Sequence, residues 1–146
     1  MIVIASDHAG VALKAELIEV IRDAGREVRD LGPTDTASVD YPDFAHRVAR
    51  EVISGEAETG VLICGTGIGM SLTANRHTGV RAALCHDAFT AEMARRHNDA
   101  NVLCIGARTT GPGVAEQMLR IFLETPFEGG RHQRRVDLIE ISQEDS

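Results

Sequence analysis

Short apolar runs alternate with longer amphipathic stretches along most of the chain, and this alternation leaves few folds open. Strands that alternate with helices pair in parallel and are joined by right-handed crossovers, so that helices cover both faces of the sheet. The sequence therefore predicts a Rossmann-like three-layer αβα sandwich around a five-stranded parallel sheet. The five expected strands are Met1–Ser6, Glu27–Leu31, Val61–Cys64, Val80–Leu84 and Val102–Ile105.

The segments between these strands carry apolar residues at helical spacing. Gly25 is expected to end the first helix, and Pro42 is expected in the first turn of the second, where its missing N–H does no harm. The expected helices are Val11–Ala24, one from Pro42 to just before Gly55, one that begins with Met70–Arg76, Ala88–Arg96, and one opened by Gly111-Pro112-Gly113.

The last stretch, Gly129–Ser146, departs from this rhythm and is expected to add an extra C-terminal helix. A helix after the fifth strand has little apolar surface left to cover on its own subunit. Residues 130–146 are therefore expected to pack on a partner subunit, with a solvated helix as the alternative. The chain of 146 residues is long enough for one domain with its own core and short for two, so we expect a single domain, 1–146.

Charge and cysteine content exclude several classes of partner. The formal net charge of −7 argues against a nucleic acid or an anionic membrane surface. No apolar run approaches the roughly 20 residues of a membrane span, and Met1–Ile4 enters a strand directly, without the regions of a signal peptide. Cys64, Cys85 and Cys104 are too few and too widely spaced for a disulfide framework or a CxxC metal site. The expected location is the cytoplasm.

A glycine-rich turn, Cys64-Gly65-Thr66-Gly67-Ile68-Gly69, follows the third expected strand and precedes a helix. Alternate glycines let successive backbone N–H groups converge on one point, and the helix N-terminus adds a partial positive charge. The same field favours a thiolate over a thiol. The turn therefore predicts an anion cradle beside a nucleophile or base, with a tight turn around a packed cysteine as the alternative.

Three better-known glycine motifs fit this turn poorly. A dinucleotide fingerprint follows the first strand and ends in glycine, whereas this turn follows the third strand and has Met70 at that place. A cysteine phosphatase loop has arginine six positions after its cysteine, which is again Met70 here. The Gly-Lys-Ser/Thr of a P-loop is absent.

Polar residues follow several of the expected strands, where ligands bind in sheets of this kind. Taken singly each has an ordinary explanation, such as a helix cap for Asp7 or Asp87. His97 and Asn98 end a helix instead, where a histidine can simply face the negative end of the dipole. Arginine side chains suit a phosphate because their forks bind its oxygens in pairs. The residues expected at the carboxyl ends of strands are Asp7, His8, Cys64, His86, Asp87 and Arg108.

Together these segments resemble the type B ribose-5-phosphate isomerases and the related galactose-6-phosphate isomerase subunits. The matches run in family order across nearly the whole chain and are more specific together than any one alone. The matching segments are SDHAG (Ser6–Gly10), DYPDFA (Asp40–Ala45), CGTGIGMSLTANR (Cys64–Arg76), RRHNDANVL (Arg95–Leu103) and EGGRHQRRV (Glu128–Val136).

The resemblance implies an aldose–ketose isomerase that interconverts D-ribose 5-phosphate and D-ribulose 5-phosphate through an enediolate, without a metal or other cofactor. It implies Cys64 as the base that moves a proton between C1 and C2, His97 as the acid for ring opening, and Thr66 as a third catalytic residue. The backbone groups that it assigns to the substrate oxygens are those of Gly65, Thr66, Gly67, Ile68 and Gly69.

The same resemblance assigns the rest of the substrate. Asp7 and Asn98 are expected to hold sugar hydroxyls, and His8 is expected to contact both the sugar and its phosphate. The residues expected to take the phosphate are His8, Arg108, Arg131 and Arg135. In this family the site is built at a dimer interface, which implies a homodimer or a tetramer with shared active sites.

One branch of the family has a glutamate base just after the last glycine of the turn, where this chain has Met70, so Cys64 is the expected base here.

Two further functions stay open at this point. The pocket depth is not fixed by the sequence, which leaves a six-carbon substrate such as allose or galactose 6-phosphate as an alternative. A phosphosugar-binding module without catalysis is the other.

Overall fold

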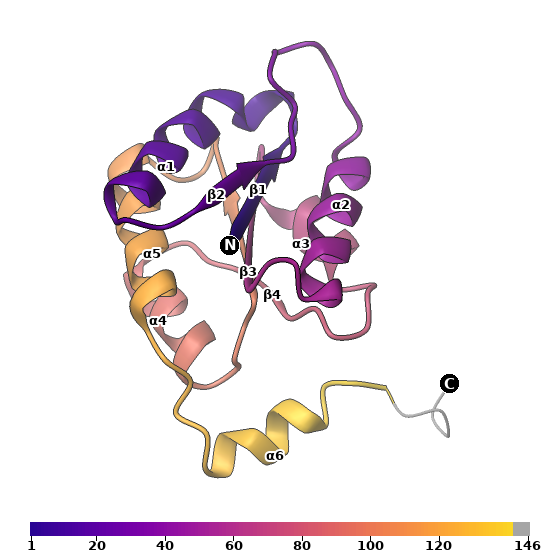
Figure 1. Ribbon diagram of the computed structural model, residues 1–146, viewed down its shortest axis with the longest axis vertical. Helices are drawn as coiled ribbons and strands as arrows, with labels where there is room; N and C mark the ends of the chain where they lie inside the picture. Colours follow the sequence, from indigo (N-terminus) through magenta and orange to yellow (C-terminus); the bar gives the residue numbers. More distant parts are fainter. Residues whose placement is uncertain (142–146) are drawn as a thin grey trace.

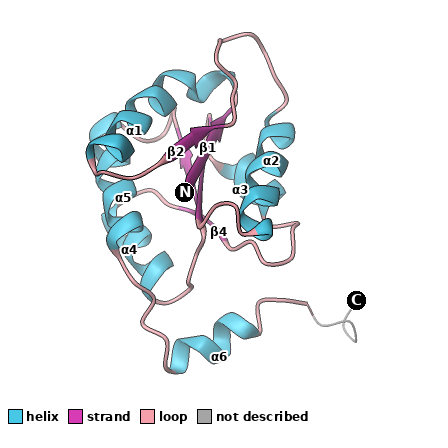
Figure 2. Ribbon diagram, viewed as in Figure 1, coloured by secondary structure: helices cyan, strands magenta, loops and turns pink. Residues whose placement is uncertain are grey.

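The fold, taken from a computed structural model that describes residues 1–141, is built on the predicted five-stranded parallel sheet. The strand order is β2-β1-β3-β5-β4, and every adjacent pair is parallel. Figure 2 shows the strands in the middle of the molecule, with helices on either side. In register, Ile4 lies beside Val61, which lies beside Leu103. The strands are β1 (Ile2–Ser6), β2 (Val28–Asp30), β3 (Thr59–Cys64), β4 (Ala82–Leu84) and β5 (Val102–Gly106).

Helices cover both faces of the sheet, which confirms the three-layer prediction (Figure 1). Alternate residues of a strand point to opposite faces, so Ile2 and Ile4 pack under one layer while Val3 and Ala5 pack under the other. The first layer contains α1 (Val11–Asp23), α4 (Ala88–Arg96) and α5 (Pro112–Glu124), and the second contains α2 (Tyr41–Ser54) and α3 (Ile68–Ala74).

Several element boundaries differ from the predictions, each by a few residues. α3 begins at Ile68 rather than Met70, because Gly67 adopts the left-handed conformation, φ +78°, and turns the chain directly into the helix. β4 begins at Ala82 rather than Val80. The backbone N–H of Arg81 donates to the Asn101 side chain, so this N–H does not take part in the hydrogen bonding between strands. A short 3-10 turn, η1 (His8–Gly10), was not predicted and precedes α1.

The predicted C-terminal helix is present as α6 (Arg131–Asp137), shorter than expected. It lies away from the helical layers, beyond the end of the sheet at which β1 begins (Figure 1). His132 and Val136 are buried, whereas Leu138, Ile139 and Ile141 beyond the helix are exposed. The end of the expected C-terminal segment, residues 142–146, lies outside the described residues.

Among residues 1–141, no helix combines the length and the apolar character that crossing a membrane requires.

Candidate functional site

Cys64 ends β3 with its side chain almost fully buried, 5 % exposed, on the α2–α3 side of the sheet. The N–H of Gly67 donates to its Sγ at 3.1 Å. A β carbon at residue 67 would come within 2.6 Å of Leu84 and 3.0 Å of the Ile105 backbone, so the turn can close only around glycine. A backbone donor aimed at sulfur favours negative charge there. The turn thus places a backbone donor directly on a buried thiol.

Arg108 lies against this turn from the end of β5. Its N–H donates to the Gly65 carbonyl at 2.9 Å, and the neighbouring Ala107 N–H donates to the Cys64 carbonyl at 2.8 Å. Its Nη1 lies 3.3 Å from the place that a β carbon on residue 65 would occupy. The absence of a side chain at Gly65 therefore lets a guanidinium approach the thiol turn.

Asp7 and His8 are held at the same edge by the end of β3 and a neighbouring loop. The Asp7 N–H donates to the Ile63 carbonyl at 3.0 Å, and one Asp7 carboxylate oxygen accepts from Ala9 at 2.9 Å. The Asp7 helix-cap interpretation is therefore correct, although its second oxygen is left for other partners. His8 accepts the Val39 N–H at its Nδ1, 3.3 Å away.

Thr66 and Ile68 complete the exposed rim of the turn. The Thr66 hydroxyl accepts the Ile68 N–H at 3.2 Å, so that particular N–H is already occupied within the chain. Its use by a substrate oxygen would require the hydroxyl to turn away. Both side chains are exposed, and Met70, the first residue after the turn, is fully buried and apolar.

Tyr41 also reaches the turn, and the sequence analysis did not assign it. It opens α2, and its ring lies 2.6 Å from the place of a β carbon on Gly69. The residue is 40 % exposed, so part of this side chain lies at the surface beside the glycine turn. The signal in the sequence that could have pointed to Tyr41 was weak. Tyr41 is the only tyrosine of the chain, and it lies in the DYPDFA segment, which was used only for its resemblance to the family.

The remaining predicted residues, His97, Asn98, Arg131 and Arg135, lie at the opposite edge of the sheet. The loop after His97 meets the beginning of β3, where the Gly60 N–H donates to the Asn101 carbonyl at 2.9 Å. A strand rises about 3.3 Å per residue, so the six residues of β3 separate the two edges by about 15–20 Å. One chain therefore brings together Asp7, His8, Cys64 and Arg108, but does not bring them to His97 or the α6 arginines.

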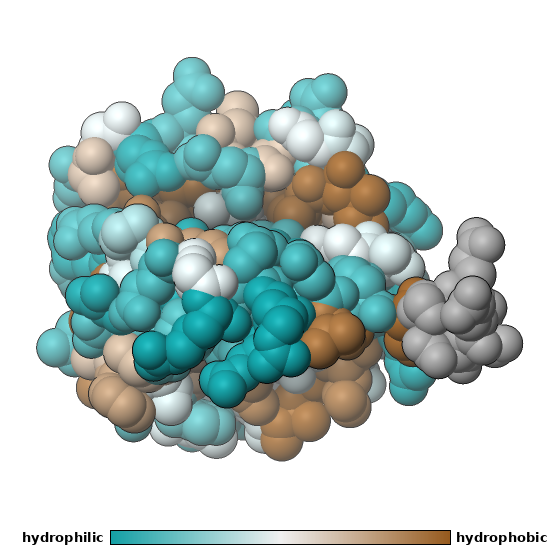
Figure 3. Space-filling view, turned by 90° about the horizontal axis from the view of Figure 1, so that it is seen from below, coloured by the Kyte–Doolittle hydropathy of each residue, from teal (hydrophilic) through white to brown (hydrophobic). Residues whose placement is uncertain are grey.

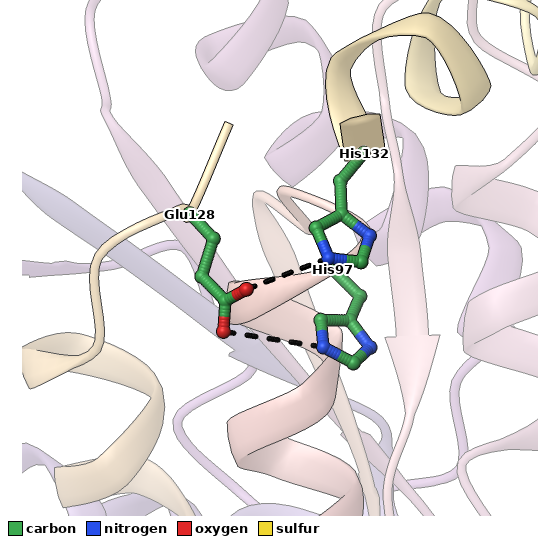
Figure 4. A group of neighbouring side chains, drawn as sticks. All are labelled: His97, Glu128 and His132. Atoms are coloured by element: carbon green, nitrogen blue, oxygen red, sulfur yellow. Dashed lines mark ion pairs between the residues drawn. The ribbon is translucent and has the colours of Figure 1, made fainter. Parts of the chain in front are cut away.

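Figure 4 shows a second group of side chains at that opposite edge, His97, Glu128 and His132. The two imidazole rings are stacked, with centroids 4.2 Å apart and planes within 12°. The Glu128 carboxylate lies 3.4 Å from His132 Nε2 and 4.0 Å from His97 Nε2. Burial and the neighbouring His97 lower the pKa of His132. His132, which the sequence offered no reason to place in the site, is buried and packs on a predicted site residue.

The other candidates from the sequence have structural roles. Asp87 caps α4, accepting the Thr90 N–H at 2.7 Å, and these hydrogen bonds lower the pKa of its carboxyl group. Cys85 and Cys104 are both buried. Burial raises the pKa of Cys85 to about 11 and that of Cys104 further, so neither is suited to act as a base.

A hollow of about 410 Å³ lies away from the thiol turn. It is lined by the loop from Asn75 to Ala83, by Asn98, and by Ile139, Glu140 and Ile141 of the C-terminal segment. Figure 3 views this end of the molecule and shows hydrophobic side chains exposed among hydrophilic ones beside the C-terminal segment. In a single chain the thiol turn is therefore open at the surface, while the hollow is at the other edge.

Known proteins share the sequence pattern and the overall fold of this chain. The family model described as Ribose/Galactose Isomerase matches residues 2–139. The chain is 43 % identical to ribose-5-phosphate isomerase B of Escherichia coli strain K12, over 91 % of this chain and 89 % of that one. The solved structure of the type B ribose 5-phosphate isomerase from Trypanosoma cruzi superposes with a TM-score of 0.92 at 51 % identity, covering 94 % of each chain. The Clostridium thermocellum ribose-5-phosphate isomerase B gives 0.93 at 46 %, covering 94 % and 93 %.

Proposed function

This chain belongs to the ribose/galactose isomerase family, and on that premise we propose that it interconverts D-ribose 5-phosphate and D-ribulose 5-phosphate, with Cys64 as the base. One observation carries the proposal: the Cys64 sulfur lies 3.1 Å from the Gly67 N–H, inside a glycine turn that Arg108 borders. A base, an oxyanion cradle and a phosphate-binding group thus meet at one edge of the sheet.

The chemistry follows from the acidity of the substrate. A proton next to a carbonyl is weakly acidic, so the enzyme must lower the energy of the enediolate and supply a base poised near neutral pH. Cys64 takes the proton from C2 of the open-chain aldose and returns it at C1, while the hydroxyl proton passes from O2 to O1 through the enediolate, which converts aldose to ketose. N–H groups of the turn hold the developing oxyanion, and each such donor is worth about 3–4 kcal/mol.

Ring opening precedes this step and needs an acid. The bond between C1 and the ring oxygen breaks, and its electron pair stays on the oxygen, which takes a proton from His97. The anomeric hydroxyl gives its own proton to water as the carbonyl forms. The phosphate never reacts, and its binding only positions the sugar. The scheme itself uses no metal ion, as the family resemblance implies.

Two copies of the chain are needed for this site. In one chain, His97, Asn98, Arg131 and Arg135 lie at the opposite edge of the sheet from Cys64, and the six residues of β3 between the two edges span about 15–20 Å. A second copy that presents its α6 edge to the thiol edge of the first would complete the site. Exposed apolar side chains are present on both surfaces, with Ile68 and Leu72 beside the turn and Leu138 and Ile139 after α6. We therefore extend the proposal to a homodimer, or to a tetramer that contains two such dimers.

The test is turnover of ribose 5-phosphate by the purified protein with EDTA present. Cys64→Ser is expected to abolish turnover while phosphate still binds, whereas the matched Cys85→Ser, another buried thiol, is expected to retain it. Full activity of Cys64→Ser would overturn the assignment of the base. Turnover confined to allose or galactose 6-phosphate would replace the five-carbon substrate by a six-carbon one. Binding without turnover of any of the three would indicate a non-catalytic module.

A further inference from the structure

We propose that Glu128 and His132 are positioning residues for His97, with Glu128 selecting the tautomer of its ring and His132 fixing the ring plane. This inference rests on the proposed function, in which His97 is the acid for ring opening. It concerns two side chains, neither of which had been assigned a role from the sequence.

The geometry places both histidines on one carboxylate. Glu128 Oε1 lies 4.0 Å from His97 Nε2, and Glu128 Oε2 lies 3.4 Å from His132 Nε2. Each ring thus faces its own oxygen of the same group, and in Figure 4 both Nδ1 atoms lie on the side away from Glu128. Hydrogen bonds of catalytic groups are commonly long before substrate binds and tighten in the complex. The His132 Nε2 is buried and has no hydrogen-bond partner at shorter range among the described residues.

The arrangement suits a shared carboxylate better than a shared metal ion. Two histidines and a glutamate are a common set of zinc ligands, and these three offer ligand atoms within 4.8 Å of one another. However, the lone pair of an imidazole nitrogen lies in the plane of its ring. Rings stacked within 12° of parallel, 4.2 Å apart, direct their lone pairs along nearly parallel lines that do not meet at one ion. Two oxygens of a carboxylate, by contrast, can each meet one of two parallel N–H groups.

Glu128 is itself held in place. Its backbone N–H donates to the Arg96 carbonyl at 3.1 Å, and the Arg96 side chain lies 3.7 Å from Glu128 Oε1. Arg96 is held in turn by Glu92 at 2.8 Å, one turn earlier on α4. The backbone of Glu128 is therefore tied to the end of α4, where His97 lies, and Arg96 draws its carboxylate toward that end. A fixed acceptor is what is required to select one tautomer of a neighbouring ring.

The consequence for the reaction concerns which nitrogen carries the proton. With Nε2–H held by Glu128, His97 gives its proton to the ring oxygen from Nδ1 and is left as the neutral Nε2–H tautomer. His132 is buried and its pKa is lowered, mainly by that burial and also by His97, so it favours a neutral ring. A neutral partner can stay stacked when His97 is positively charged, whereas two charged rings 4.2 Å apart would repel.

Glu128→Gln tests the role of the carboxylate. Glu92→Gln is the matched control, because Glu92 and Glu128 both contact Arg96. Two rates are compared in each protein: conversion of ribose 5-phosphate, which requires ring opening, and exchange of a C1 proton of ribulose 5-phosphate in D₂O. Ribulose 5-phosphate cannot form a furanose because its 5-hydroxyl is esterified, so its exchange requires proton abstraction alone. Glu128→Gln is expected to slow conversion about 10–100-fold, part of the 10²–10⁴-fold that a positioned general acid supplies. Exchange should stay within about threefold of wild type. Glu92→Gln should keep both rates, because the amide oxygen of glutamine can still accept the hydrogen bond from Arg96.

Two further measurements separate positioning from folding. A two-bond ¹H–¹⁵N spectrum should show His97 protonated at Nε2 in the wild type and in Glu92→Gln, and a mixture of tautomers in Glu128→Gln. His132→Phe, which keeps a stacked ring, should lose less conversion than His132→Ala, with thermal melting used to select folded variants. If Glu128→Gln converts ribose 5-phosphate at the wild-type rate and its His97 keeps the wild-type tautomer, the inference is overturned. A wild type that neither converts nor exchanges would instead overturn the proposed function.

Discussion

The ring of Tyr41 lies against the α carbon of Gly69, so that a β carbon on residue 69 would approach two ring carbons to 2.6 Å. This contact joins the first turn of α2 to the first turn of α3, directly beside the thiol turn. The glycine is thus required by the aromatic neighbour rather than by an unusual backbone angle.

Gly69→Ala should therefore destabilise the protein and lower its turnover. Overpacking of this kind typically costs about 1–3 kcal/mol of unfolding free energy. Gly113 provides the control: it also lies in a first helical turn, and its added β carbon would meet nothing within 4 Å. Gly113→Ala should be neutral or stabilising by up to about 1 kcal/mol. Urea unfolding of the two variants checks the difference, and equal stability would show that the tyrosine moves aside freely.

Mixing two inactive variants tests the sharing of sites between chains. Cys64→Ser removes the base at one edge, and Arg131→Ala removes a phosphate-binding arginine at the other. If each site combines both edges from different chains, one of the two sites in every mixed dimer is intact. An equal mixture should then recover about a quarter of wild-type activity, because half of the dimers are mixed. Failure to recover, with subunit exchange confirmed by mass spectrometry, would mean that each site is built from one chain.

Asp99 should be sensitive to substitution, because it adopts a positive φ of +46°. Its carboxylate lies 3.0 Å from Arg95 and 3.4 Å from Arg81, and these contacts hold the loop that carries His97. Asp99→Ala loses both ion pairs and keeps the backbone strain, for an expected cost of about 1–3 kcal/mol. Asp99→Asn should cost less, since asparagine tolerates the left-handed region. Denaturant unfolding of both variants measures their free energies of unfolding. An Asp99→Asn variant less stable than Asp99→Ala would contradict the expected order.

Acid should weaken the packing of α2 on the segment after α3. His46 Nδ1 lies 2.7 Å from His77 Nε2, and burial, His46 and Arg50 lower the pKa of His77 from 6.5. The unfolded chain then binds a proton more readily than the folded one, so stability is lost as pH falls below 6.5. The urea midpoint should drop between pH 7.5 and pH 5.5, and His77→Gln should reduce that drop. An unchanged drop in the variant would exclude His77 as its source.

The sheet and the thiol turn were predictable because they depend on local patterns. Each strand is a short apolar run bounded by turn residues, and the positions of Asp7, Cys64 and Arg108 follow once the strands are parallel. The strand order β2-β1-β3-β5-β4 was not predictable, since several crossovers satisfy the same pattern. It is this order that places the ends of β1, β3 and β5 side by side.

The contacts of His132 and Tyr41 were not predictable for a different reason. His132 meets His97 across 35 positions of chain, and the contact exists only because α5 returns the chain to the end of α4. Tyr41 meets Gly69 through the packing of two helices on one face of the sheet. Such pairs depend on tertiary geometry and leave no period or spacing in the sequence.

The distance between the two edges of the sheet has a consequence for mixed populations of chains. In a dimer with shared sites, a chain damaged at one edge spoils one site and spares the other. A chain damaged at both edges spoils both sites of any dimer it joins, even with a perfect partner. In such a dimer, lesions spread over two chains would leave one site intact, whereas the same lesions in one chain would leave none, so the two edges would act as independent halves of each site.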